Sequence, residues 1–164
     1  MNTTTAPALA TALRRLQLTG LVYTVMFLGA VQVFVFAPSQ LIGVFNAVSA
    51  QLLPSWPLAR DAGPFWLSLA ASMMYCISTL SWMLWRNPAR WADMAVPLVV
   101  AKFASSACGF GFFVAGCLRP ETGWATLPNL TIMLTDLPLG LWLAWAYAQV
   151  LRHRPADVAL QDTR

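Results

Sequence analysis

The feature that most constrains the fold is an apolar stretch of 23 residues, from Ala95 to Cys117, that contains one charged residue, Lys102. A helix of about 20 apolar residues is long enough to cross the hydrocarbon core of a bilayer. A charged side chain inside such a helix costs about 2.5 kcal/mol or more, so it normally faces protein or water. The stretch therefore predicts a transmembrane helix whose lysine must be sheltered by its neighbours.

Three further stretches are long and apolar enough to span a membrane, and only 10% of the residues are charged, against about a quarter in a soluble domain. We predict an all-α membrane protein with four transmembrane helices in an antiparallel bundle, because the connections on either side of the third span are short. The predicted spans cover residues 16–37, 65–85, 95–117 and 125–149. They lie in a transmembrane domain of residues 14–151, between flexible cytoplasmic tails at 1–13 and 152–164.

A shorter helix is predicted between the first and second spans. It follows Pro38, and its apolar residues Leu41, Phe45, Val48 and Leu52 recur at helical spacing. The segment is too short to cross a bilayer. We expect an amphipathic helix that lies flat at the membrane surface or against the bundle.

The arginines are distributed unevenly between the two ends of the predicted spans. One side holds Arg14, Arg15, Arg86, Arg90, Arg152, Arg154 and Arg164, and the other holds Arg60 and Arg119. The positive-inside rule then places both termini in the cytoplasm. A single lysine beside nine arginines is typical of a GC-rich bacterial genome, so we expect a multi-pass protein of the bacterial inner membrane. The net charge of +4 resides at helix ends rather than in a patch with aromatics, which argues against a nucleic-acid partner.

Each predicted span carries a stripe of small or polar residues, and the simplest arrangement turns all four stripes inward. In the fourth span, Asp136 shares a helix face with Gly140 and Ala144, and such small residues let another helix approach closely. Because an isolated charge in hydrocarbon is costly, one hypothesis is that Lys102 and Asp136 pair, directly or through a water. The candidate pocket is formed by Lys102, Asp136, Tyr75, Ser105, Ser106, Gln32 and Thr135.

A second arrangement of the two charges is open at this point. Lys102 and Asp136 lie on opposite sides of their helix centres, which separates them by about 9 Å along the membrane normal. Lys102 would then extend to the cytoplasmic headgroups. Asp136 would be protonated and hydrogen-bonded to Thr135, Asn129 or Tyr75.

The residues expected of an enzyme or of a metal site are scarce. His153 is the only histidine and lies in the predicted cytoplasmic tail, which excludes an intramembrane haem held by two histidines and a Ser-His-Asp triad within the membrane. The three cysteines form no C-x-x-C pair. We therefore expect no catalytic residue, no metal and no cofactor, and an enzyme is the least favoured of three functional interpretations.

The layout of the chain resembles that of the DoxX-like group of small bacterial four-helix membrane proteins. The resemblance rests on the proline-bounded segment PSQLIGVFNAVSAQLLP after the first span, the arginine-bearing turn RNPARW after the second, and Lys102 in the third. It covers residues 16–151. It implies a four-helix membrane fold and, for some members, an accessory role beside membrane oxidoreductases. Asp136 also resembles the intramembrane acids of a related group of eukaryotic sterol- and lipophile-binding four-helix proteins.

Two functional hypotheses follow. The first is a non-catalytic accessory or assembly subunit of a larger membrane complex, whose apolar surface contacts a partner membrane subunit or a second copy of the chain. The second is a binder or transporter of a lipid or small amphiphile, which would enter the polar pocket around Lys102 and Asp136. Under either hypothesis the lipid bilayer is the immediate partner.

Overall fold

The computed structural model describes residues 5–60 and 63–154, in which every regular element is helical and no strand occurs. The long helices are α1 (Thr5–Phe36), α3 (Pro64–Arg86), α5 (Ala95–Leu118) and α6 (Leu127–His153). Between them lie α2 (Pro38–Leu52), α4 (Pro88–Trp91) and the short 3-10 turns η1 (Ala92–Met94) and η2 (Pro120–Thr122). A proline lies in the first turn of α2, α3 and α6. Its fixed φ suits that position, where no helical N–H bond is lost.

The four long helices are long and apolar enough to cross a membrane, which indicates a multi-pass membrane protein. The predicted all-helical fold with four helices of membrane-spanning length is thereby confirmed. One boundary differs clearly from prediction. Residues 5–13, expected in a flexible tail, belong to α1, where Ala12 is buried and Leu9 and Leu13 pack against the core. The remainder of that tail, like most of the C-terminal tail, lies outside the described residues.

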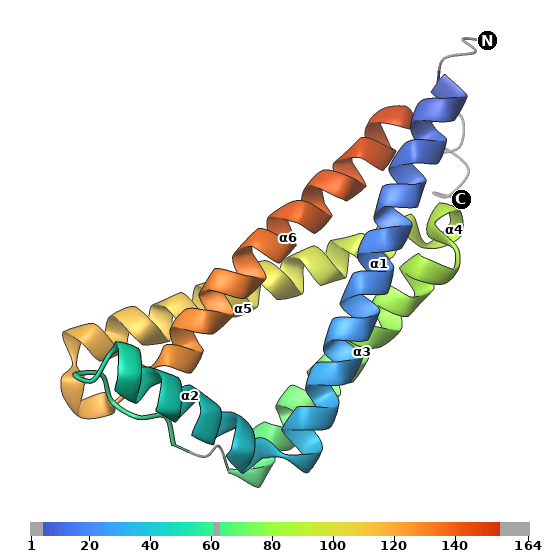
Figure 1. Ribbon diagram of the computed structural model, residues 1–164. Helices are drawn as coiled ribbons and strands as arrows, with labels where there is room; N and C mark the ends of the chain where they lie inside the picture. Colours follow the sequence, from blue (N-terminus) through green and yellow to red (C-terminus); the bar gives the residue numbers. More distant parts are fainter. Residues whose placement is uncertain (1–4, 61–62, 155–164) are drawn as a thin grey trace.

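The long helices form two closely packed pairs, α1 with α3 and α5 with α6 (Figure 1). In the first pair the backbones meet at Gly20, where an added Cβ would lie 2.8 Å from the Trp85 nitrogen and 2.9 Å from the Ser81 carbonyl. The Gln17 side chain donates to the Trp85 carbonyl at 2.9 Å. Contact at backbone distance explains why this position carries glycine.

The two pairs are joined mainly through α1 and α6, whereas α3 and α5 share few contacts. The Trp142 indole of α6 donates to the Thr19 hydroxyl of α1 at 3.0 Å, and the Arg15 guanidinium lies 5.4 Å from the Trp145 ring centroid. These contacts place the first part of α1 beside the last part of α6, at one end of the molecule (Figure 1). A closed antiparallel four-helix bundle stays a prediction.

The predicted short helix is present as α2, which lies across the opposite end of the molecule and contacts both α1 and α6 (Figure 1). The Asn46 amide fixes the following loop, because it donates to the Ala59 carbonyl at 3.0 Å and accepts from the Ala59 nitrogen at 2.8 Å. Ser49 is buried, while Val48 and Leu52 of the predicted apolar face are exposed. Leu41 and Phe45 of the same face are half-buried, so this face is only partly exposed, and its position at a membrane surface stays a prediction.

Candidate functional site

Small residues determine how α5 and α6 pass each other. A Cβ added to Gly116 would lie 2.1 Å from the Ala125 nitrogen, and one added to Gly109 would lie 3.2 Å from the Ile132 Cβ. One added to Gly140 would lie 3.0 Å from the Lys102 Cβ. As the position on α5 increases, the facing position on α6 decreases. The two helices therefore run in opposite directions, and Lys102 is level with Gly140.

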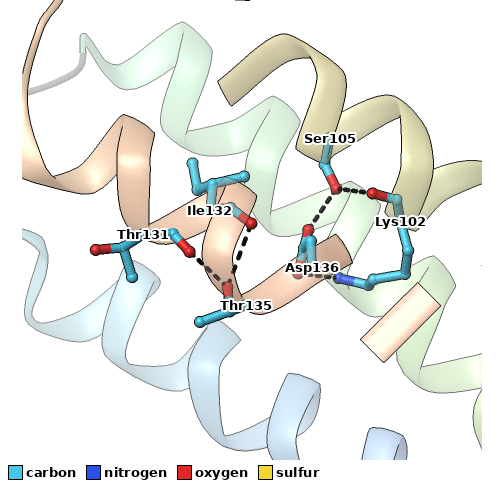
Figure 2. Close-up of polar contacts among 6 residues, drawn as sticks. All are labelled: Lys102, Ser105, Thr131, Ile132, Thr135 and Asp136. Carbon is cyan, nitrogen blue, oxygen red and sulfur yellow. Dashed lines mark hydrogen bonds and ion pairs between the residues drawn. The ribbon is translucent and has the colours of Figure 1, made fainter. Parts of the chain in front are cut away.

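The two intramembrane charges meet in this interface. Lys102 Nζ lies 2.8 Å from Asp136 Oδ1, within the range of a charge-assisted hydrogen bond (Figure 2). The Lys102 side chain is only 2% exposed, and that of Asp136 is 15% exposed. The direct pair is therefore present, and the arrangement with Lys102 extended to the headgroups is wrong.

The helix register explains how the pair forms despite the expected offset. Lys102 faces Gly140, which is one helical turn from Asp136 on the same face of α6. Four residues of helix advance about 6 Å, rather than the 9 Å estimated from the span boundaries. Because Gly140 has no side chain, the lysine stem can run along α6 and reach the carboxylate.

Two further side chains complete the surroundings of the pair. The Ser105 hydroxyl makes a short hydrogen bond to Asp136 Oδ2 and also lies 3.1 Å from the Lys102 carbonyl (Figure 2). Its single proton serves one acceptor at a time, and the carboxylate is the stronger one. From α1, the Phe27 ring centroid lies 3.8 Å from Lys102 Nζ, a cation–π contact. The Lys102 ammonium of α5 is thus neutralised by Asp136 of α6 and covered by Phe27 of α1.

The other predicted pocket residues are placed differently. The Thr135 hydroxyl is turned away from the pair and donates to the Thr131 carbonyl at 2.8 Å (Figure 2). Gln32 is exposed on α1, and Tyr75 is 46% exposed on α3. Ser106 is buried, one turn beyond Lys102. The structure therefore brings together Lys102, Asp136 and Ser105 of the seven predicted residues, with Ser106 on the same helix face as Lys102.

The polar stripe of α3 faces outward, so the prediction that all four stripes turn inward is wrong. Its members are Ser68, Ser72, Tyr75 and Thr79, and all four are exposed. The residues that α3 buries are Ile77, Ser78, Ser81 and Leu84, on the opposite side of the helix. The reason is the backbone contact at Gly20 of α1. This contact requires α3 to present the face that carries the small residue Ser81.

Sequence reasoning assigned Gln32 of α1 to the site and missed the two α1 residues that contribute to it, Phe27 and Tyr23. Phe27 covers the lysine, and Tyr23 packs beside it with a ring-centroid distance of 5.8 Å. Tyr23 is almost fully buried and lies within electrostatic reach of Asp136. Aromatic residues are frequent in every span, so nothing in their spacing distinguished these two.

The hollows on the surface of the described residues include two that are not lined by Lys102 or Asp136. The larger, of about 810 Å³, lies between the loop after α2 and the α5–α6 connection, where Asn46, Arg60 and Trp124 contribute to its wall. The smaller, of about 400 Å³, lies between α1 and α6. The ion pair is therefore a packed contact rather than the floor of either hollow.

The chemistry available at the pair is limited. The described residues contain no group of three histidine, cysteine or acidic side chains that could hold a metal ion. The carboxylate and the ammonium neutralise each other, and the neighbouring hydroxyl is bonded to the carboxylate. The arrangement is suited to holding α5 and α6 together. Comparisons with family models, curated proteins and solved structures found no match.

Proposed function

We propose that this protein is a non-catalytic accessory or assembly subunit that binds a partner within the membrane through the outward face of α3. The observation that carries the proposal is the exposed polar stripe Ser68, Ser72, Tyr75 and Thr79. Three of the hydroxyls donate back to carbonyls of α3 itself, and the Tyr75 phenol points outward. Polar groups facing lipid gain from a neighbouring helix that offers hydrogen bonds, and small side chains let that helix approach.

The ion pair supports the same proposal from the inside of the molecule. Its two charges are satisfied by Ser105, by Phe27 and by each other, so they stabilise the α5–α6 pair. Because Lys102, Asp136 and Ser105 are bonded to one another, none of the three is free to act as an acid, base or nucleophile. The layout shared with the DoxX-like group, some of whose members resemble accessory subunits, favours the same assignment.

We place the protein in the bacterial inner membrane with both termini in the cytoplasm. The start of α1 and the end of α6 lie at the same end of the molecule, as an even number of spans requires (Figure 1). The arginine excess at that end favours the cytoplasm. A fluorescent-protein fusion to the C-terminus should fluoresce, and an alkaline phosphatase fusion at the same point should be inactive. The reverse pattern would contradict this orientation.

The proposed partner contact is tested by capture from native membranes. The tagged chain is cross-linked in situ and solubilised in mild detergent, and the proteins retained are identified by mass spectrometry. The change Ser72→Leu should abolish retention of the partner, while the control Met73→Leu, on another face of α3, should preserve it. A wild-type protein that elutes alone, or a Ser72→Leu variant that retains the same partner, would contradict the proposal.

A second candidate function, binding of a lipid or small amphiphile near the ion pair, is favoured by one observation. The Tyr23 hydroxyl and the Ser106 hydroxyl are buried and have no hydrogen-bond partner within the described residues. Buried polar atoms are normally paired, so these two could bond the polar group of a ligand. The change Ser106→Ala, which removes one of these two hydroxyls, should then reduce the amount of a lipid that co-purifies with the wild type while the chain remains folded. Identical lipid content in both proteins would exclude this candidate.

A further inference from the structure

The smaller hollow is an apolar groove between α1 and α6, at the end of the molecule where α1 begins. Its walls include Leu18 and Val22 of α1 and Leu139 of α6, and Tyr23 lies in its wall with its hydroxyl unpaired within the described residues. The volume is about 400 Å³, and one side is open to the surroundings of the helices. We call it the α1–α6 groove. Its apolar walls suit a hydrocarbon chain.

An arginine lies at one end of this groove in a defined position. Arg15 contributes to the lining, and its guanidinium lies 5.4 Å from the Trp145 ring centroid. The helices are held together beside it, because the Trp142 indole donates to the Thr19 hydroxyl, which donates in turn to the Arg15 carbonyl at 2.9 Å.

We propose that the α1–α6 groove binds an anionic phospholipid, with one acyl chain along its walls and the phosphate on the Arg15 guanidinium. The charge at the end of the groove complements a phosphate, and basic pockets between transmembrane helices are typical sites for anionic headgroups. The phosphate end of the groove is distant from the ion pair, because Arg15 precedes Phe27 by 12 residues of α1, about 18 Å of helix, whereas the other end reaches Tyr23, which packs on Phe27. It is also independent of the proposed partner face on α3.

The test compares two phospholipids that share the same acyl chains and differ in headgroup charge. The full-length chain in mild detergent is titrated with dioleoyl phosphatidylglycerol or dioleoyl phosphatidylcholine, and bound lipid is counted by native mass spectrometry. One arginine near the membrane surface contributes about 1 kcal/mol, so the wild type should bind phosphatidylglycerol about fivefold more tightly. Equal affinities for the two lipids would overturn the proposal.

Two pairs of variants locate the site. Arg15→Gln should reduce the preference for phosphatidylglycerol to about one, whereas Arg90→Gln should leave it near fivefold. Arg90 is a matched control, because it is exposed, lies 4.8 Å from the Trp91 ring centroid and does not line the groove. A preference that survives Arg15→Gln, or that falls equally in Arg90→Gln, would overturn the assignment.

The second pair fills the groove instead of removing its charge. Val22→Trp places a large side chain in the groove and should weaken binding of both lipids. Val25→Trp, at an exposed position of α1 outside the groove, should not. Binding that is unchanged in Val22→Trp would contradict the proposed position of the acyl chain. If Val22→Trp does not fold, the two arginine variants still decide the question, and capture of a partner through α3 is measured separately.

Discussion

Removing one charge of the intramembrane pair is predicted to be far more damaging than removing both. The 2.8 Å contact between Lys102 Nζ and Asp136 Oδ1 corresponds to a gross attraction of about 6 kcal/mol at an effective dielectric constant of 20. Most of this attraction is offset by the desolvation of the two groups. Asp136→Asn leaves the lysine, only 2% exposed, without its counter-charge, which should cost about 3–5 kcal/mol of unfolding free energy.

The double variant Lys102→Met/Asp136→Asn removes both charges with little change in volume. Its stability should lie within about 1 kcal/mol of the wild type, because neither neutral side chain has the desolvation cost of an ion. The coupling energy from the four proteins should therefore be at least about 2 kcal/mol. The assay is unfolding in mixtures of dodecyl maltoside and sodium dodecyl sulfate, followed by far-UV circular dichroism.

The exposed carboxylate of Asp93 provides the control for the buried carboxylate of Asp136. Asp93→Asn alters an exposed carboxylate that lies 3.6 Å from Arg154 and accepts from the Tyr147 hydroxyl. Surface pairs contribute little, so this variant should lose less than about 1 kcal/mol. Additive effects of Lys102→Met and Asp136→Asn, with a coupling below about 0.5 kcal/mol, would refute the conclusion that the pair is a buried contact.

Two further predictions concern the packing of α5 on α6. Gly116→Ala should destabilise the protein by about 2–3 kcal/mol in the same assay, since its Cβ would lie 2.1 Å from a backbone nitrogen, whereas Gly111→Ala, with nothing within 4 Å, should have no effect or stabilise by up to about 1 kcal/mol. Equal effects would contradict the close approach at Gly116. In a chain whose native cysteines are replaced by alanine, Gly109→Cys/Ile132→Cys should form a disulfide that holds the fragments together after cleavage in the α5–α6 connection, because the two Cβ positions are 3.2 Å apart. The Asn129 carbonyl, 2.8 Å from the added Cβ, requires the helices to separate by a few tenths of an ångström, about the amount that brings the Cβ–Cβ distance into the disulfide range. Gly111→Cys/Ile132→Cys should not form a disulfide, and equal cross-linking of both pairs would contradict the register.

The helical class and the approximate spans could be predicted because hydrocarbon constrains composition and length together. A span must be apolar over about 20 residues, and each such segment of this chain has become a long helix. The start of α1 could not be predicted, since residues 5–13 are mostly small and include Pro7 and two threonines. They continue the helix because Leu9, Ala12 and Leu13 pack against the core, a contact that no local pattern encodes.

The need to shelter Lys102 and Asp136 could be predicted from their energetic cost, but a direct pair could not be distinguished from a lysine at the headgroups beside a protonated aspartate. The cost of an isolated charge pointed to Lys102 and Asp136, but the offset estimated from span boundaries argued against direct contact. The register that removes this offset depends on glycines at 109 and 140, which meet the facing helix, and at 116, which meets the segment leading into α6.

The outward face of α3 shows where pattern reasoning failed. In a soluble helix a polar stripe faces water and an apolar stripe faces the core, but inside a membrane both faces of a helix can be apolar. Ser78 and Ser81 are small and could pack against Gly20, and they compete with Ser68 and Ser72 for the interface. The backbone contact with α1, rather than polarity, decided which face was buried.

The most direct test of the central claim uses the fact that Lys102 is the only lysine in the chain. In lipid bilayers, protein labelled with ¹⁵N at lysine Nζ and ¹³C at the aspartate carboxyl carbon is measured by rotational-echo double-resonance solid-state NMR. The 2.8 Å contact with Asp136 Oδ1 predicts strong dephasing of the single lysine signal, which Asp136→Asn should remove. A lysine signal that no aspartate dephases in the wild-type protein would contradict the intramembrane pair.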